Sequence, residues 1–138
     1  MPSKGSTYAA GYDLYACIPN GREALAIDPH KTYRIGTGWA FEIPEGYFGA
    51  IFARSGLATR QGLRPANCVG VIDSDYRGEI QVALHNDTNV MQCIVEGERI
   101  AQLVILPVIN IDSFETIDEL EDLEETERGK GGFGSTGK

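Results

Sequence analysis

The sequence predicts an all-β fold of the sandwich, jelly-roll or small-barrel type. Between Leu14 and Ile111, short apolar segments are separated by turn residues, as at Pro19-Asn20-Gly21. No stretch keeps the 3.6-residue period of a long amphipathic helix. Many short strands divided by Gly, Pro, Asn and Asp are typical of packed antiparallel sheets or a small barrel.

Nine segments are candidate strands, because they are rich in the β-branched, aromatic and aliphatic residues that fit a pleated, half-buried surface. Most end at a turn signal. In chain order they are residues 14–18, 25–28, 32–35, 39–43, 47–53, 69–72, 80–85, 90–95 and 100–105. Residues 55–61 are the one candidate helix, since Ser55 is of a type that often begins helices.

Residues 67–79, NCVGVIDSDYRGE, combine an amide, a carboxylate and a phenol and are the strongest candidate for a functional site. Val71 and Ile72 favour a strand, whereas the following Asp-Ser-Asp and Arg-Gly favour turns. Beyond them Ile80, Val82 and Leu84 alternate with Gln, Ala and His, which predicts a second strand with one buried face. We therefore expect a β-hairpin.

An exposed hairpin edge presents backbone N–H and C=O groups that can read the edge of a flat heterocycle. Asn67 offers both donors and an acceptor to an imide, and Gly70 leaves room for a ring to come close. Asp73 can accept a proton from water or a hydroxyl, and Tyr76 can place its ring beneath a sugar. The alternative is an ordinary hairpin with a polar tip.

The length of 138 residues predicts a single domain with its own core. We divide it into a catalytic β domain at residues 1–112, an acidic connector at 113–127 and a flexible glycine-rich lid at 128–138. No apolar run could span a bilayer and no signal peptide is recognisable, so we expect a cytoplasmic protein without a membrane partner. Three cysteines without a CxxC or Cys/His cluster indicate reduced thiols.

The net charge of −8 comes from one segment of the chain and is not spread over all of it. Eight of the 20 acidic residues lie between Glu115 and Glu127, and the remaining 12 match the 12 Lys and Arg residues. The acidic run is typical of a solvated connector or a short helix. No basic patch with interleaved aromatic residues is present, so we expect no nucleic-acid partner.

Five short motifs, taken in order, resemble the trimeric deoxyuridine triphosphatase (dUTPase) family. They are AGYDLYA from Ala10, RSGLA from Arg54, the segment at residues 67–79, GERIAQL from Gly97 and RGKGGFGSTG from Arg128. Five motifs in one order are far more specific than any one of them. Most members carry a further strand before the first motif, whereas nine residues precede Ala10 here. We therefore expect either that the chain lacks this strand or that its start is truncated.

The resemblance implies a jelly-roll subunit in a homotrimer with three active sites, each drawing on all three chains. The implied activity is hydrolysis of dUTP to dUMP and pyrophosphate, which keeps uracil out of DNA and supplies dUMP. The implied cofactor is Mg²⁺, held mainly by the substrate phosphates. The alternatives are a dCTP deaminase-like enzyme of the same fold and a nucleotide-gated regulatory protein.

By the same resemblance, one group of residues would recognise the nucleoside. Asn67 and the backbone of the hairpin would read uracil, and Tyr76 would pack beneath the deoxyribose. The hairpin residues concerned are Gly70, Val71 and Ile72.

A second group would act on the phosphates. Asp73 would contact the 3′-hydroxyl and orient the attacking water as general base, with Gln102 as the other catalytic residue. Arg54, Ser55 and Gly56 would bind the phosphates.

The remaining implied residues concern the metal and the tail. Asp13 would contact Mg²⁺ through water, although a carboxylate after Gly11 could equally fix a turn. The tail would close over the substrate from a neighbouring chain through Arg128, Phe133, Gly134 and Ser135. By composition alone the tail favours a flexible segment.

Other polar residues are assigned structural roles. Arg99 is expected to be an ion-pair partner, and Asp75 and Glu79 to be turn and surface charges. His30 is expected in an exposed loop. His85 ends a candidate strand and is expected to be a hydrogen-bonded edge histidine rather than a catalyst.

Overall fold

The structure is a computed structural model that describes residues 1–109 and Thr126. Apart from Thr126, the predicted acidic connector and the predicted lid lie outside the described residues. Their division from the β domain therefore stays a prediction. In the part of the chain that is described, no helix has the length and apolar character needed to cross a membrane.

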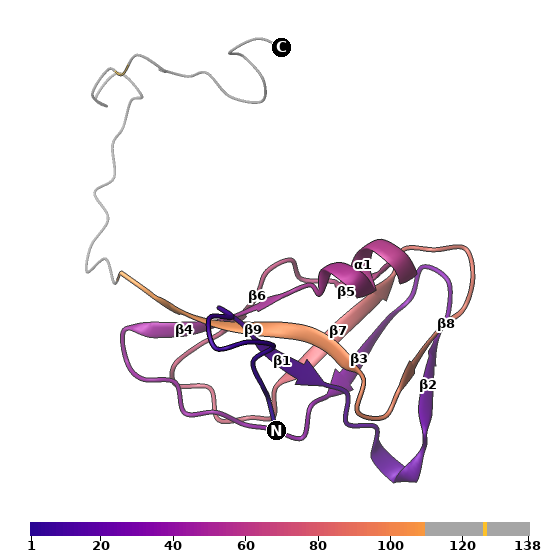
Figure 1. Cartoon of the computed structure of the whole chain (residues 1–138), viewed down its shortest axis with the longest axis horizontal. Coiled ribbons are helices and arrows are strands. Elements are labelled where there is room, and N and C mark those ends of the chain that lie inside the picture. Colours follow the sequence, from indigo (N-terminus) through magenta and orange to yellow (C-terminus); the bar gives the residue numbers. More distant parts are fainter. Residues whose placement is uncertain (110–125, 127–138) are drawn as a thin grey trace, which may run out of the picture.

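The described residues form a mostly β jelly-roll-type fold, as the sequence predicts (Figure 1). One short α-helix and one 3₁₀ turn interrupt the strands. The elements are β1 (Tyr12–Tyr15), η1 (Pro19–Gly21), β2 (Ala24–Ile27), β3 (Thr32–Gly36), β4 (Tyr47–Phe52), α1 (Ser55–Gln61), β5 (Leu63–Pro65), β6 (Gly70–Ile72), β7 (Gln81–Asn86), β8 (Gln92–Val95) and β9 (Arg99–Pro107).

The strands make three antiparallel sheets. A four-stranded sheet has the order β1-β9-β4-β6, a three-stranded sheet has the order β3-β7-β5, and β2 pairs with β8. The long strand β9 runs through the middle of the first sheet and carries both β1 and β4 (Figure 1). Side chains that β1, β4 and β9 place opposite each other therefore lie on one face of that sheet.

Inward-facing aliphatic residues from all three sheets form one core. Each such side chain, when fully buried, contributes about 1.5 to 3 kcal/mol. The predicted alternation after the turn is confirmed, because Ile80, Val82 and Leu84 are buried. The same cluster includes Leu14, Ile27, Ile35, Ile51, Leu63, Ile94, Ile100 and Leu103.

One strand prediction is wrong, and one strand was missed. Residues 39–43 form no strand, although Trp39, Phe41 and Ile43 alternate as a strand would. Among the described residues, the backbone of this segment makes a single hydrogen bond to another backbone group, from the Ile80 N–H to the Trp39 carbonyl at 2.8 Å, which is too little to form a ladder. Conversely β5 was not predicted, because it is only three residues long and ends in Pro65; proline is accommodated at sheet edges.

The predicted hairpin does not form. β6 pairs with β4 in the four-stranded sheet, whereas β7 pairs with β3 and β5 in the other. Residues 73–80 therefore cross from one sheet to the other instead of turning back on a neighbouring strand. The alternating pattern defined which side chains are buried, but it did not define which strand each would pair with.

The outer face of the four-stranded sheet is largely apolar. By strand register it includes Phe48, Phe52, Val71, Val104 and Leu106, which are half-buried or exposed. Val71 is 58% exposed and Phe52 is 37% exposed. A contiguous apolar face of this kind is typical of a surface that another protein chain covers.

Candidate functional site

Asp13 is the centre of the first polar group in the candidate site. β1 places Asp13 opposite Gln102 of β9, and Asp13 is only 4% exposed. Arg54 Nε donates to Asp13 Oδ1 at 3.1 Å, and Gln102 Nε2 donates to the same oxygen at 3.3 Å. Arg99 Nη1 lies 3.4 Å from Oδ2, as its expected ion-pair role requires. Residues far apart in sequence thus meet around one carboxylate.

Ser55 and Gly56 begin α1 directly after this group. Arg54 is the residue before the helix, and both Ser55 and Gly56 are exposed. The first N–H groups of a helix have no partner within the helix. A Cβ at Gly56 would meet no atom within 4 Å, so the surface here is open.

Asp13 also allows a prediction about stability. We expect Asp13→Asn to lower the free energy of unfolding by about 1 to 3 kcal/mol, because two arginines lose their buried counter-charge. Urea denaturation of the full chain measures this. Asp75→Asn is the matched control, since that carboxylate is exposed and makes no ion pair within residues 1–109. Equal stability of the two variants would contradict the anchoring role.

β6 is the second part of the site and lies at the edge of its sheet. Among the described strands it pairs only with β4, so its other edge presents backbone groups without a strand partner, although the edge does not belong to the predicted hairpin. Gly70 is buried, and a Cβ there would lie 3.1 Å from Asn67 Nδ2. Glycine therefore leaves room for the Asn67 amide beside the strand, while Val71 faces outward and Ile72 packs against the core.

Asp73 and Tyr76 follow β6 on the surface. The Tyr76 N–H donates to the Asp73 carbonyl at 3.2 Å, which closes a turn between them. Within residues 1–109 the Asp73 carboxylate has no ion-pair partner, so it is available to accept a proton. An open groove of 960 Å³ runs beside it, lined by Glu42, Ile43, Pro44, Glu45, Asp73, Ser74, Asp75 and Arg77.

The two polar groups are well separated within one chain. Asp73 follows Ile72, which pairs with Gly49 near the start of β4, whereas Gln102 pairs with Phe52 at its end. At about 3.4 Å per residue, Asp73 and Gln102 are separated by roughly 14 Å along the strand direction. They are also separated by roughly 10 Å across the sheet, because β4 lies between their strands. The structure therefore groups Asp13, Arg54 and Gln102 but leaves Asp73 apart from them.

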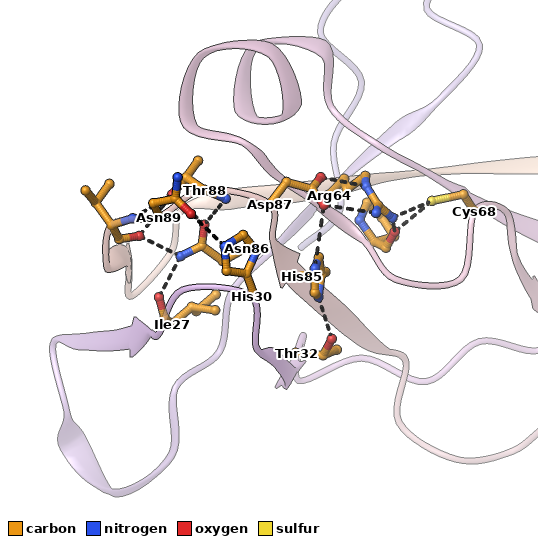
Figure 2. Close-up of polar contacts among 12 residues, drawn as sticks. Ile27, His30, Thr32, Arg64, Cys68, His85, Asn86, Asp87, Thr88 and Asn89 are labelled. Carbon is orange, nitrogen blue, oxygen red and sulfur yellow. Dashed lines mark hydrogen bonds and ion pairs between the residues drawn. The ribbon is translucent and has the colours of Figure 1, made fainter.

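A third polar network supports the loop that carries Asn67 (Figure 2). Arg64 on β5 makes two hydrogen bonds to Asp87, at 2.7 and 3.0 Å. Its Nη1 lies 3.4 Å from Cys68 Sγ, and the thiol donates to the Pro65 carbonyl at 2.8 Å. The hydrogen bond to Asp87 raises the pKa of Arg64. Sequence reasoning missed Arg64 because no motif marks it.

The histidines are structural, as expected, with one correction. His85 Nδ1 lies 2.9 Å from Thr32 Oγ1, so it is hydrogen-bonded (Figure 2). It sits on β7, the central strand of its sheet, rather than at an edge. His30 lies in an exposed loop and contacts Asn89.

The fold and the two polar groups define a jelly-roll β protein with a candidate ligand site divided between two ends of one sheet. The dUTPase family model matches residues 1–137. This chain belongs to the dUTPase family.

Individual relatives are similar over most of the chain. The deoxyuridine 5′-triphosphate nucleotidohydrolase of Desulfitobacterium hafniense is 49% identical over 109 residues, which cover 78% of this chain and 70% of that protein. The structure of a mutant dUTPase of Staphylococcus bacteriophage 80alpha with dUpNHpp has a TM-score of 0.85 at 29% identity, covering 99% of this chain and 91% of that one. A mutant dUTPase from phage phi11 of S. aureus, described with a structural Mg(II) ion, has a TM-score of 0.75 at 26% identity, covering 88% and 91%.

Proposed function

We propose that this protein hydrolyses dUTP to dUMP and pyrophosphate. The observation that carries the proposal is the exposed Asp73 carboxylate, without an ion-pair partner in the described part of the chain, directly after an edge strand. Its relative from D. hafniense is named for this activity, and its phage 80alpha relative holds dUpNHpp. The reaction removes dUTP, the precursor of uracil in DNA, and supplies dUMP.

Recognition of the nucleoside is assigned to the edge of β6. The backbone groups of Gly70, Val71 and Ile72 read the uracil edge, and the Asn67 amide completes the hydrogen-bonding pattern. Tyr76 packs beneath the deoxyribose. A rigid backbone edge rejects the methyl group of thymine by collision, and it rejects cytosine because a donor replaces an acceptor.

Catalysis is assigned to Asp73 as general base. Its carboxylate accepts a proton from the water that attacks the α-phosphorus, the bond to the pyrophosphate oxygen breaks, and pyrophosphate leaves. Gln102 orients that water. Arg54, Ser55 and Gly56 bind the phosphate oxygens by charge and by N–H groups at the start of α1.

Magnesium is the proposed cofactor, and the residues present fit an indirect role for the protein. The Asp13 carboxylate already accepts from Arg54, Gln102 and Arg99, which leaves it room for a metal-bound water rather than for direct ligation. Within the described residues no group of three or more His, Cys, Asp or Glu side chains could hold a metal ion. When bound to the triphosphate, Mg²⁺ neutralises charge on the phosphate oxygens.

We also propose that the active form is a homotrimer with shared active sites. Two groups that orient one water must both lie within hydrogen-bond distance of it. Asp73 and Gln102 of one chain are too far apart for that, so Gln102 of another chain would complete the site. The apolar outer face of the four-stranded sheet supplies a surface for such an assembly. Arg128, Phe133, Gly134 and Ser135 are proposed to close over the substrate.

A nucleotide panel tests the activity. The full chain is incubated with Mg²⁺ and dUTP, dTTP, dCTP or UTP, and both pyrophosphate and ammonia are measured. We expect pyrophosphate from dUTP and little from the others. Ammonia released from dCTP would instead indicate a deaminase of the same fold, and no product from dUTP would contradict the proposal.

A further inference from the structure

The Tyr76 side chain is held in one orientation by its own segment of chain. Its hydroxyl donates to the backbone carbonyl of Glu79 at 3.1 Å. Its ring lies over Gly78 so closely that a Cβ there would overlap the ring atoms. The ring direction is therefore defined before any ligand arrives, by Gly78 beneath it and by the Glu79 carbonyl at its tip.

Glu79 is itself fixed by the loop after β3. The Gly38 N–H donates to Glu79 Oε1 at 2.7 Å. Gly38 has a φ of +71°, a conformation that favours glycine. A Cβ at Gly36 would come within 2.5 Å of the same Oε1, so a second glycine makes room for the carboxylate. Glu79 is thus more than the surface charge that the sequence suggested.

The next residue is anchored to the same loop. The Ile80 N–H donates to the Trp39 carbonyl at 2.8 Å, and the hydroxyl of Thr37 donates to the Ile80 carbonyl at 2.8 Å. Thr37 is only 3% exposed, so this bond is shielded from water. Three hydrogen bonds therefore fasten residues 79 and 80 to residues 37–39, and the carbonyl that orients Tyr76 belongs to this fastened segment.

We propose that Glu79 is a positioning residue for sugar discrimination: its carboxylate fixes the backbone carbonyl that holds the Tyr76 ring against the 2′ position of the sugar. The inference rests on the proposed function. A 2′-hydroxyl is rejected only where the ring contacts that position closely, and a loosely held ring would move aside to admit it. Rejection of ribose thus depends on how firmly the ring is held, not only on its presence.

The test compares kcat/KM for dUTP and for UTP in variants of the full chain. Glu79→Ala is expected to lower the dUTP-to-UTP ratio about 3- to 10-fold, which corresponds to the net contribution of one hydrogen bond. The ratio should fall because kcat/KM for UTP rises. The kcat for dUTP should stay within about twofold of the wild-type value, because no reacting group is changed. Glu79→Gln should keep the ratio, since its amide oxygen also accepts from the Gly38 N–H.

Glu23→Ala is the matched control, because Glu23 is an exposed glutamate whose side chain makes no hydrogen bond or ion pair within residues 1–109. An unchanged ratio in Glu79→Ala at wild-type melting temperature would overturn the proposal. So would an equal loss of activity on both nucleotides, which indicates a purely structural role. If Glu79→Ala does not fold, Glu79→Asp replaces it in the test. Aspartate keeps the negative charge, but its side chain is one methylene group shorter, so the carboxylate lies farther from the Gly38 N–H.

The wild-type arm separates this inference from the proposed function. A wild type that leaves dUTP uncleaved would overturn both. A wild type that cleaves dUTP beside a Glu79→Ala variant with the wild-type ratio would overturn only the positioning role.

Discussion

Asp73→Asn is expected to lower kcat for dUTP hydrolysis by about 10² to 10⁴, the usual contribution of a general base. The amide has nearly the same shape as the carboxylate but cannot accept a proton from water. Because the carboxylate makes no ion pair in the described part of the chain, its replacement should leave the fold and most substrate binding intact. Steady-state kinetics with dUTP and a separate measurement of binding to a non-hydrolysable analogue test both statements.

Asp75→Asn is the control for this variant. Asp75 lies two residues away and lines the same groove, so it carries the same change of charge without the proposed contact. It should keep nearly full kcat. An Asp73→Asn variant with ordinary turnover would refute the assignment of the general base, and equal losses in both variants would point to the charge of the groove instead.

Tyr76→Ala is expected to reduce discrimination against UTP by about 10- to 150-fold. This range corresponds to roughly 1 to 3 kcal/mol, the cost of burying a 2′-hydroxyl without a hydrogen-bond partner, which the variant no longer imposes. Discrimination against dCTP should change much less, because the base is read by the backbone of β6. The measurement is kcat/KM for dUTP, UTP and dCTP under the same conditions.

Tyr76→Phe is the matched control, since it keeps the ring and removes only the hydroxyl that bonds to the Glu79 carbonyl. It should lose about 3- to 10-fold of the discrimination against UTP, the net contribution of one hydrogen bond, and therefore much less than Tyr76→Ala loses. Equal losses of discrimination against UTP and dCTP in Tyr76→Ala would count against a role for the ring at the sugar.

Most of the local elements were predictable, because their signals are local. Residues 55–61 were predicted as a helix, and α1 has those bounds. The alternation of Ile80, Val82 and Leu84 correctly gave the buried face of β7 and of the residue before it. For β7 the period of the apolar residues is enough, because a pleated backbone has a fixed period. Ser55 marked where α1 begins, but the N-cap residue is Arg54 and no side chain caps the helix.

Strand pairing was not predictable from these signals. The sequence suggested that the segments on either side of Asp73 pair with each other, yet β6 joins β4 and β7 joins β3 and β5. Alternation states which side chains are buried but not which strand lies beside them. That choice depends on how all three sheets share one core.

The β class, the five dUTPase motifs and the identity of the candidate site residues could all be read from the amino-acid sequence. The folded chain was needed to show that Arg54, Arg99 and Gln102 surround Asp13, and that Asp73 lies at the far end of the same sheet. Residues that are distant along the chain come together only through strand register, and strand register depends on long-range packing.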